Sequence, residues 1–406
     1  MIEVGEGKKV PEIRFAGFTN AWEQRKLGDI MNITSVKRIH QSDWTDSGIR
    51  FLRARDIVSA SKNEEPDDYL YISKEKYDEY SLVSGKVAIG DLLVTGVGTI
   101  GVPYLIRNSE PLYFKDGNII WFQNGTKIDG YFFLYSFFGK AIQDFINESA
   151  GIGTVGTYTI ESGKKTPISL PEMKEQQQIG AYFRNLDNLI TLHQRKHEKL
   201  VIIKKAMLEK MFPQNGSNVP EIRFAGFTGP WEQRKFEDIA VRSSTISSER
   251  GLPRIEYEDI VSGTGCLNKD VFAKKCDKAG IVFRKGDVLY GKLRPYLQNW
   301  LLPSFNGLAV GDFWVLQPQN ADGSFLYRLI QSRQFDEVAN QSTGTKMPRA
   351  DWKLVSKTEF FIPNTIDEQA AIGTFFEQID SLITLHQRKY ETLKRVKAAL
   401  LQKMFV

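Results

Sequence analysis

The chain has 406 residues, of which 41% are hydrophobic, and a formal net charge of +5 from 54 basic and 49 acidic side chains. This length suits two or three domains, and the mild basic excess permits a polyanionic partner without requiring one. The two cysteines, Cys266 and Cys276, support neither a disulfide framework nor a zinc site, and the sequence has no membrane-spanning apolar run, so we expect a cytoplasmic protein.

The N-terminal segment of the chain is repeated. VPEIRFAGFT spans residues 10–19 and returns at 219–228, and each copy soon continues into WEQRK. A second repeat, LITLHQRK, spans 189–196 and 382–389 within matching stretches that end in Lys-Met-Phe. The stretch between the repeats is shorter in the second half, and the two inserts align only patchily. We therefore interpret the chain as a tandem duplication in which one scaffold carries two different recognition surfaces.

These repeats divide the chain into six segments. We expect a lead-in over 1–30, a mixed domain over 31–170, a long helix over 171–213, a linker with the second lead-in over 214–239, a second mixed domain over 240–362, and a final long helix over 363–406. Short β-like runs at 86–95, 101–107 and 118–122 lie between Gly, Asp and Asn turns, and 131–145 has helical spacing. The first insert should therefore mix α and β structure.

Two long amphipathic helices are predicted, over 175–212 and 367–405. Neither stretch contains a proline, and in the first the apolar residues recur at spacings of three and four. A helix with so broad an apolar stripe needs a partner, and we expect the two copies to pair antiparallel. The first helix is followed by a lead-in, so the second should end close to where the first lead-in begins, at residue 10.

Two glycine-rich segments match nucleotide-binding patterns only superficially. Residues 96–101 fit GxGxxG, but Pro103 follows at once and the next residues predict a strand rather than the required helix. Residues 286–293 approach a P-loop, but Leu293 stands where a magnesium-binding Ser or Thr is needed. We expect no nucleotide site at either position.

Metal-binding and catalytic patterns are also incomplete. His193 and His197 have a spacing that could chelate zinc on a helix, but the second copy does not repeat the pair. Residues 66–68 could open a PD-(D/E)xK nuclease motif, yet no ExK follows nearby. All 15 prolines are isolated, so the (D/N)PPY motif of amino-methyltransferases cannot occur. We expect neither catalytic residues nor metal ligands in this chain.

Two loops correspond between the inserts. GDLLVTG at 90–96 matches GDVLYGK at 286–292, and the loop at 149–159 matches STGTKMPR at 342–349. Glycine lets a backbone approach a phosphate, Ser and Thr donate hydrogen bonds, and Lys and Arg contact phosphates or guanine edges. The pattern favours DNA contact and leaves ordinary surface loops as the alternative.

The candidate DNA-contacting residues are basic, hydroxyl-bearing or aromatic side chains in or near these loops. They are Arg53, Arg55, Thr95, Thr99, Thr154 and Tyr158 in the first insert, and Arg254, Tyr257, Lys292, Arg294, Tyr296, Thr345, Lys346 and Arg349 in the second.

The chain resembles the specificity subunit of type I restriction-modification systems. The resemblance rests on GDVLYGKLRPYL, STGTKMPR, the Glu-Gln pair that follows a proline at each helix start, and the LITLHQRK helices, and it covers essentially the whole chain. It implies an α+β fold: two mixed α/β target recognition domains separated by two long antiparallel, coiled-coil-like helices in a pseudo-twofold repeat. It further implies a noncatalytic DNA-recognition subunit, each domain reading half of an asymmetric bipartite target.

The same resemblance implies a set of partners. These are double-stranded DNA, two methyltransferase (modification) subunits and restriction/translocase subunits; S-adenosylmethionine, ATP and Mg are expected in the partner subunits, and no cofactor in this chain. The helices would set the spacer between the half-sites and dock the methyltransferase subunits through Leu186, Ile190, His193, Leu200, Met207, Ile379, Ile383, His386, Leu393 and Leu400.

Two other interpretations remain open. One is a coiled-coil adaptor that binds only protein partners, and the other is a fused recognition protein similar to type II methyltransferases or nucleases. The missing catalytic motifs weigh against an enzyme, and the divergence of the two inserts weighs against an adaptor.

Overall fold

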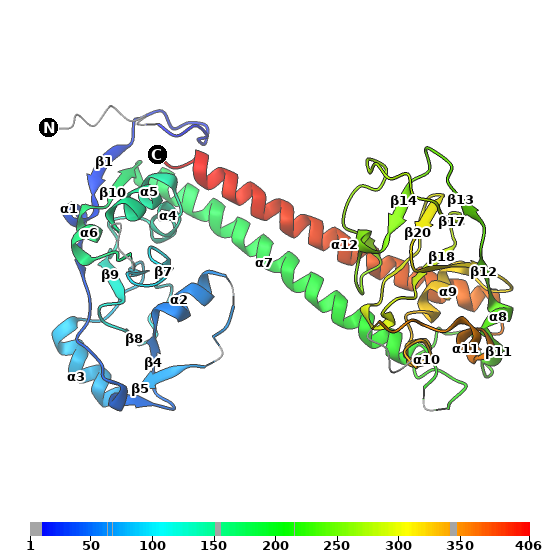
Figure 1. Cartoon of the computed structure of the whole chain (residues 1–406). Coiled ribbons are helices and arrows are strands. Elements are labelled where there is room, and N and C mark those ends of the chain that lie inside the picture. The colour runs from blue at the N-terminus through cyan, green and yellow to red at the C-terminus, as the bar shows by residue number, and fades with distance from the viewer. Residues whose placement is uncertain (1–9, 63, 67, 151–155, 215, 342–346) are drawn as a thin grey trace. The chain divides into compact units, whose positions relative to one another are not determined.

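The computed structural model of the chain describes residues 10–62, 64–66, 68–150, 156–214, 216–341 and 347–406. The chain forms two compact units (Figure 1). Unit 1 comprises Met1–Gln194 with Arg388–Val406, and unit 2 comprises Arg195–Gln387. The boundaries fall inside the two long helices, so each unit contains part of both.

Unit 1 combines a lead-in, a mixed α/β region and its parts of the long helices. Its elements are β1 (Glu23–Lys26), α1 (Leu27–Ile30), β2 (Asn32–Thr34), η1 (Gln41–Asp43), β3 (Trp44–Thr45), β4 (Ile49–Leu52), α2 (Ala54–Ser61), β5 (Leu70–Ile72), α3 (Lys74–Ser84), β6 (Leu92–Thr95), β7 (Pro103–Leu105), β8 (Leu112–Phe114), β9 (Ile119–Gln123), α4 (Gly130–Ser136), α5 (Lys140–Ser149), α6 (Ile160–Lys165), β10 (Pro167–Leu170), the start of α7 (Met173–Lys210) and the end of α12 (Ile366–Lys403).

Two four-stranded sheets form the mixed region of unit 1. One has the order β2-β9-β6-β7 and is antiparallel, and the other has the order β3-β5-β4-β8 with β4 and β8 parallel. Leu92 and Val94 face one hydrophobic core, whereas Leu93 between them faces another. Successive side chains of a strand point to opposite faces. The sheet β2-β9-β6-β7 is therefore covered on both faces, which explains why the sequence of β6 is a continuous apolar run.

The start of α7 and the end of α12 share one core in unit 1. Phe183 of α7 is fully buried in the same cluster as Leu401 and Met404. Lys397 of α12 forms an ion pair with Asp187 of α7 at 2.6 Å. The predicted antiparallel pairing of the long helices is confirmed within this unit, because the start of one helix meets the end of the other.

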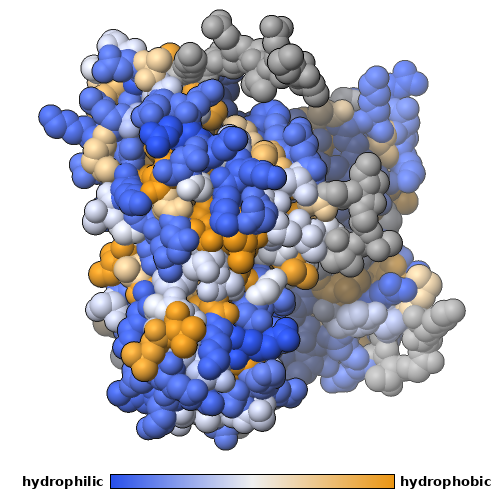
Figure 2. Space-filling model, turned by 90° about the vertical axis from the view of Figure 1, so that its left-hand side faces the viewer, coloured by the Kyte–Doolittle hydropathy of each residue, from blue (hydrophilic) through white to orange (hydrophobic). Residues whose placement is uncertain are grey.

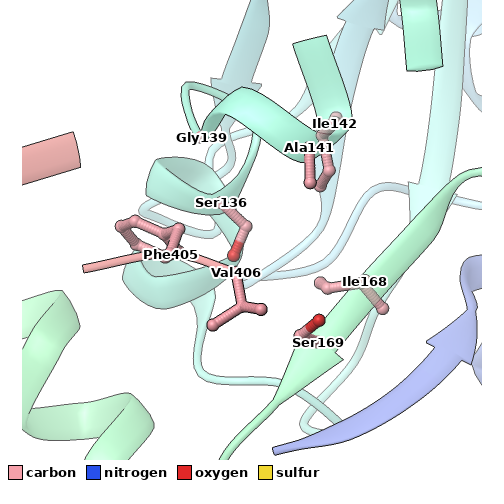
Figure 3. A pocket seen from close by; sticks show the side chains of 8 residues that line it. All are labelled: Ser136, Gly139, Ala141, Ile142, Ile168, Ser169, Phe405 and Val406. Carbon is pink, nitrogen blue, oxygen red and sulfur yellow. The ribbon is translucent and has the colours of Figure 1, made fainter. Parts of the chain in front are cut away.

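The C-terminal residues of the chain dock into unit 1. Phe405 and Val406 lie between the α4–α5 junction and β10, beside a narrow pocket that Ser136, Ile142 and Ile168 help to line (Figure 3). The lead-in meets the same end of α12, where the amide of Ile13 donates to the carbonyl of Lys403 at 3.0 Å. The expected proximity of the first lead-in and the end of the second helix is confirmed.

Unit 2 repeats this plan with different connections. Its elements are β11 (Glu232–Lys235), α8 (Phe236–Ile239), β12 (Ala240–Ser243), β13 (Ile246–Ser247), β14 (Arg254–Glu256), η2 (Tyr257–Asp259), β15 (Ile260–Val261), β16 (Cys266–Leu267), β17 (Gly280–Phe283), β18 (Val288–Gly291), η3 (Pro295–Leu297), β19 (Trp300–Leu301), β20 (Gly307–Val310), β21 (Phe313–Pro318), α9 (Gly323–Leu329), α10 (Arg333–Ala339), α11 (Trp352–Lys357), β22 (Glu359–Ile362), the end of α7 and the start of α12.

The first sheet of unit 2 matches that of unit 1, and the second differs. The order β12-β21-β18-β19 repeats β2-β9-β6-β7, and β11 pairs with β22 as β1 pairs with β10. The second sheet has the order β13-β17-β20-β14 and keeps only the parallel pair, here β14 with β20. Lys204 of α7 pairs with Asp380 of α12 at 2.7 Å, which repeats the helix-to-helix ion pair of unit 1.

The structure confirms the mixed α and β character of the first insert and refines two local boundaries. Residues 131–145, which have helical spacing, are divided between two helices: α4 ends at Ser136 and α5 begins at Lys140, because Gly139 between them has an extended backbone. The predicted strand over 86–95 begins only at Leu92. The carboxylate of Asp91 accepts hydrogen bonds from the amides of Ala88 and Gly125, which ties the preceding residues into a turn.

Candidate nucleic-acid interface

Each lead-in is fastened to the start of a long helix by a buried ion pair. Arg14 donates to both carboxylate oxygens of Glu175 at 2.6 and 2.7 Å, and Arg223 donates to both oxygens of Glu368 at 2.7 Å. Both glutamates are buried. Bidentate pairs of this kind fix geometry as well as charge. The first residue of the shared Glu-Gln motif thus joins lead-in to helix.

The second residue of the motif anchors the mixed region. Gln176 donates to the carbonyl of Pro171 at 2.9 Å and accepts from the amide of Asp129, the N-cap of α4, at 3.0 Å. Gln369 makes the same two bonds to Pro363 and Asp322 in unit 2, at 3.0 and 2.9 Å. The Glu-Gln motif, one of the features that carry the family resemblance, therefore sets the position of each mixed region on its long helix.

Three backbone segments meet in unit 1 at the candidate site. The loop that follows β6 is bonded to the residues before β9, where the amide of Gly96 donates to the carbonyl of Asn118 at 2.8 Å. It is also bonded to the segment before α6, because Tyr158 donates its amide to the carbonyl of Gly96 at 2.9 Å and Val97 forms a β-bridge with Thr157. The two loops predicted from the sequence are therefore adjacent.

Unit 2 repeats this junction bond for bond. Lys292 donates its amide to the carbonyl of Asp312 at 2.9 Å and accepts from the amide of Ala350 at 2.9 Å, and Leu293 forms a β-bridge with Arg349. We call these residues the loop junction of each unit. The equivalent pairs, unit 1 first, are Gly96 and Lys292, Val97 and Leu293, Gly98 and Arg294, Asn118 and Asp312, Thr157 and Arg349, and Tyr158 and Ala350.

The unit 2 junction carries charge where the unit 1 junction is neutral. Asp312 pairs with Arg349 at 3.1 Å and with Lys292 at 3.5 Å. Burial alone would raise the pKa of Asp312, but its hydrogen bond with Arg349 and the charges of both cations outweigh burial and lower it below the ordinary value of 3.8. The carboxylate is therefore ionised at neutral pH and lies between two basic side chains, those of Lys292 and Arg349.

Arg294 has an unusual backbone conformation. Its φ of 49° lies in the left-handed region, and the equivalent Gly98 has a φ of 78°. A non-glycine residue in this region costs about 1 kcal/mol or more, and such strain tends to mark functional sites. Its side-chain Nε is buried without a hydrogen-bond partner, and the neighbouring Tyr296 is exposed. The unit therefore retains an arginine where its counterpart uses the residue that best fits the backbone.

Several candidates in unit 1 are occupied by internal contacts. Thr95 is fully buried and its hydroxyl donates to the carbonyl of Thr99, whereas Thr99 itself is exposed. Tyr158 is buried with its hydroxyl bonded to Thr166. Thr95 and Tyr158 therefore have no exposed polar group in this structure and shape the loop from inside. Thr154 lies outside the described residues.

Arg53 and Arg55 hold a neighbouring segment. Arg53 bonds to Asp56, the third residue of α2, and both arginines bond to Asp68. Burial lowers the pKa of Arg53, but its hydrogen bonds to Asp56 and Asp68 outweigh burial and raise the pKa above its ordinary value. Arg55 is mostly exposed, so of the two it is the one that a ligand can reach.

In unit 2, Arg254 and Tyr257 also serve the fold. Arg254 is buried and donates to four backbone carbonyls, those of Lys278, Leu252, Glu249 and Ser248. Tyr257 donates its hydroxyl to the carbonyl of Leu293 in the loop junction, and burial raises its pKa. Thr345 and Lys346 lie outside the described residues.

Most of the positions predicted to bind partners pack against the chain's own domains. Leu186, Ile190 and Ile379 are buried, and Met207, Ile383, Leu393 and Leu400 pack against the same cores from partly buried positions. Leu200, His193 and His386 are partly exposed. The exposed apolar residues of the long helices instead include Leu189, Leu192, Val201 and Ile202 on α7 and Leu382, Leu385 and Val396 on α12. The apolar stripe seen in the sequence did not show which of its residues pack against the chain's own cores and which stay exposed.

A charged network that the sequence did not reveal lies beside the unit 2 junction. Glu256 and Asp259 bind Lys274, and Lys269 and Lys278 add further ion pairs to them. Asp259 occupies the same position as Asp56, and each begins the sequence Asp-Ile-Val-Ser. This shared tetrapeptide is the feature of the sequence that could have indicated the equivalence of the two aspartates.

The described residues include no helix long and apolar enough to cross a membrane and no cluster of three His, Cys, Asp or Glu side chains that could hold a metal ion. The face of unit 1 in Figure 2 is mostly hydrophilic, with hydrophobic residues in several separate patches.

The fold and the repeated junctions define a duplicated scaffold that presents two unlike mixed α/β regions. The family model for the type I restriction modification DNA specificity domain matches residues 20–201 and again residues 230–395. The chain therefore belongs to this family.

Relatives and solved structures agree with this assignment. A putative type I restriction enzyme specificity subunit from Haemophilus influenzae is 33% identical over 41% of each chain. The MjaVIII specificity subunit from Methanocaldococcus jannaschii is 25% identical over 65% of this chain and 67% of that protein. The S subunit structure from M. genitalium has a TM-score of 0.61 at 14% identity, covering 98% of this chain and 99% of that one, which shows a common fold.

Proposed function

We propose that this chain is the noncatalytic, sequence-specific DNA-recognition subunit of a type I restriction-modification complex. The observation that carries the proposal is the loop junction, which recurs with the same backbone bonds in both units of a chain of the specificity-domain family while its side chains differ. A shared backbone with divergent side chains is what two readers of two different half-sites require.

Unit 2 would read its half-site with charged side chains. Arg294 and Arg349 can each form bidentate hydrogen bonds to the O6 and N7 of guanine or bind phosphate oxygens, and Lys292 can neutralise a phosphate. Tyr296 is exposed next to Arg294 and offers a flat surface and a hydroxyl. We expect the half-site of this unit to contain guanine.

Unit 1 would read its half-site with neutral groups. Thr157 of its junction and Thr99 beside the junction are exposed, and a side chain at Gly98 would meet no other atom within 4 Å. Hydroxyl groups and exposed backbone amides can bond to base edges or phosphates without a formal charge. Unit 1 should therefore depend less on salt than unit 2 does.

The long helices would connect the readers and bind the enzymatic partners. Each has 38 residues and a length of about 57 Å at about 1.5 Å per residue. We propose that this length sets the spacer between the half-sites. We also propose that the exposed residues Leu189 and Leu192 in unit 1, and Leu382 and Leu385 in unit 2, each contribute to the binding of a methyltransferase subunit. S-adenosylmethionine, ATP and Mg would then act in the partner subunits.

Methylation mapping in cells that carry this chain with its partner subunits tests the proposal. The expected product is an asymmetric, bipartite modified sequence. A helical turn inserted after Gln194 in α7 and after Gln387 in α12 leaves the ion pairs Asp187–Lys397 and Lys204–Asp380 in place. We expect the spacer to change and both half-sites to stay the same; an unchanged spacer would contradict the role of the helices.

Arg294→Gly tests the reader function without disturbing the fold. The variant carries the residue that unit 1 uses at this position, so relief of backbone strain should raise the stability of the chain by about 1 kcal/mol. Recognition should weaken only in the half-site read by unit 2, by about 1 to 3 kcal/mol if the lost contact is bidentate to a base. Undiminished binding to every sequence would remove Arg294 from the interface.

A protein-only adaptor is the second candidate, favoured by the exposed apolar residues on α7 and α12. Copurified chains and DNA binding separate the two. The adaptor would bind its partners and show no sequence preference on duplex DNA.

A further inference from the structure

Asp312 is an anion paired with two cations of the unit 2 loop junction, Lys292 and Arg349. It lies between β20 and β21, and its carbonyl oxygen accepts the amide of Lys292 at 2.9 Å, which holds its backbone in the loop junction. Its carboxylate bonds to Arg349 at 3.1 Å and lies 3.5 Å from the ammonium of Lys292. Its side chain is partly exposed, so a ligand that reached the two cations would also meet the carboxylate.

The carboxylate is matched to the two cations. In unit 1 the equivalent residue is Asn118, whose carbonyl accepts the equivalent amide of Gly96 at 2.8 Å. The residues in place of the cations there are Gly96 and Thr157, and neither carries a charge. Both units thus share the backbone hydrogen bond at this position, whereas only the unit with two neighbouring cations has a carboxylate there. The backbone therefore does not account for the choice of an acidic residue.

A carboxylate beside basic side chains would be expected to reduce binding to DNA of any sequence. Every DNA sequence presents phosphates, so free Lys and Arg side chains bind all sequences alike and strongly at low salt. A fixed carboxylate repels a phosphate that approaches without the correct register, and its bonds keep both cations in one geometry. Discrimination between partners is often achieved in this way, by adding repulsion against the wrong partner.

We propose that Asp312 is a specificity-determining positioning residue that holds Lys292 and Arg349 in place and lowers the affinity of unit 2 for DNA that lacks its half-site. This rests on the proposed DNA-recognition function. The proposal gives a role in recognition to a side chain that has the same negative charge as DNA.

The substitution Asp312→Asn tests this inference, because Asn is the residue that unit 1 already carries at this position. The backbone bond to Lys292 remains available, so the variant should fold. The full chain with its copurified partners is titrated with two labelled duplexes. One carries the mapped target, and the other has the same length and spacer with both half-sites scrambled. Both titrations are repeated over a series of salt concentrations.

We expect the affinity for the scrambled duplex to rise severalfold, with a salt dependence steeper by about one charge. The ratio of target to scrambled affinity should fall. Asp312→Glu, which retains the charge, should keep most of the discrimination. Glu237→Gln is the matched control: it removes one negative charge from the ion pair with Lys357, outside the junction, and should leave the ratio unchanged.

Two outcomes would overturn the inference. Equal affinities of the variant and the original chain for the scrambled duplex would show that the carboxylate does not oppose unspecific binding. A weaker affinity for the target alone would show that Asp312 contacts a base directly. A third result would contradict the proposed function itself: the original chain would bind the target and scrambled duplexes equally well. This result can be told apart from the two outcomes above, because it does not involve the variant.

Discussion

The two loop junctions share the same backbone hydrogen bonds but carry different side chains. In both units the loop after the central strand bonds to the same two neighbouring segments, yet Gly96, Gly98, Asn118 and Thr157 in unit 1 stand where unit 2 has Lys292, Arg294, Asp312 and Arg349. Backbone hydrogen bonds do not depend on side-chain identity, so the framework can persist while every exposed group changes. The comparison shows which groups the duplication did not preserve, and these are the groups that we propose to read DNA.

A second difference between the units concerns the ion pairs around a shared aspartate, Asp56 in unit 1 and Asp259 in unit 2. Asp56 and Asp259 each cap the turn that follows a parallel strand. In unit 1 the neighbouring cations Arg53 and Arg55 bind Asp68, whereas in unit 2 the neighbouring anion Glu256 binds lysines of the segment 269–278. The same task, holding the next segment to the cap, is performed with opposite signs. The ion pairs beside the capped turn therefore have opposite polarity in the two units.

The largest expected effect tests the part of the scaffold that both units share. Glu368→Ala should leave the partly buried guanidinium of Arg223 with only the carbonyls of Thr228 and Gly229 as partners and destabilise unit 2 by about 3 kcal/mol, the lower end of the cost of breaking a buried ion pair. Glu368 also accepts a hydrogen bond from the indole of Trp231 at 3.2 Å, whereas the indole nitrogen of the equivalent Trp22 is buried without a partner. Urea unfolding should therefore show a smaller loss for Glu175→Ala.

The control for this comparison is the pair of substitutions Glu368→Gln and Glu175→Gln, which keep the shape and remove the charge. Both should lose stability by similar amounts, since glutamine can still accept from the indole. Equal losses for the two alanine variants would show that the tryptophan bond contributes nothing.

An intermediate effect tests how far the two junctions can be exchanged. A Cβ added at Gly96 would lie 2.6 Å from the carbonyl oxygen of Tyr158, so Gly96→Ala should force the two segments apart and cost about 1 to 3 kcal/mol. A Cβ at Gly98 meets nothing within 4 Å, although its φ of 78° adds some strain. Gly98→Ala should therefore cost less, and thermal unfolding of both variants measures the difference.

Acidification should act on the charged network of unit 2. Burial raises the pKa of Asp259, but hydrogen bonds from Lys269 and Lys274 outweigh burial and lower it below 3.8. A lowered folded-state pKa means that this stabilisation is present above the ordinary value and is lost as pH falls through the folded-state pKa. We expect stability to decline below about pH 4. In Asp259→Asn this part of the decline should be absent, which stability measured across pH would show.

The sequence predicted the scaffold better than the site, for physical reasons. Long helices and repeated lead-ins follow from periodicity and from direct comparison of the copies, and α7 and α12 lie within a few residues of the expected bounds. The role of Asp312 depends on backbone bonds between segments far apart in the chain. Arg254 and Tyr158 looked like ligands because residue type does not report burial. Exposure separates a contact residue from a structural one, and only the folded chain supplies it.

The smallest expected effect on stability distinguishes two neighbouring arginines of unit 1. Arg53 is mostly buried and bonds to both Asp56 and Asp68, whereas Arg55 shares only Asp68 in an exposed pair. Exposed pairs contribute about 0 to 1 kcal/mol, so Arg55→Ala should leave unfolding almost unchanged while Arg53→Ala destabilises unit 1. If Arg55→Ala nevertheless weakens DNA binding, Arg55 contacts DNA directly. If only Arg53→Ala weakens binding, and in proportion to its loss of stability, this network supports the reader without touching the DNA.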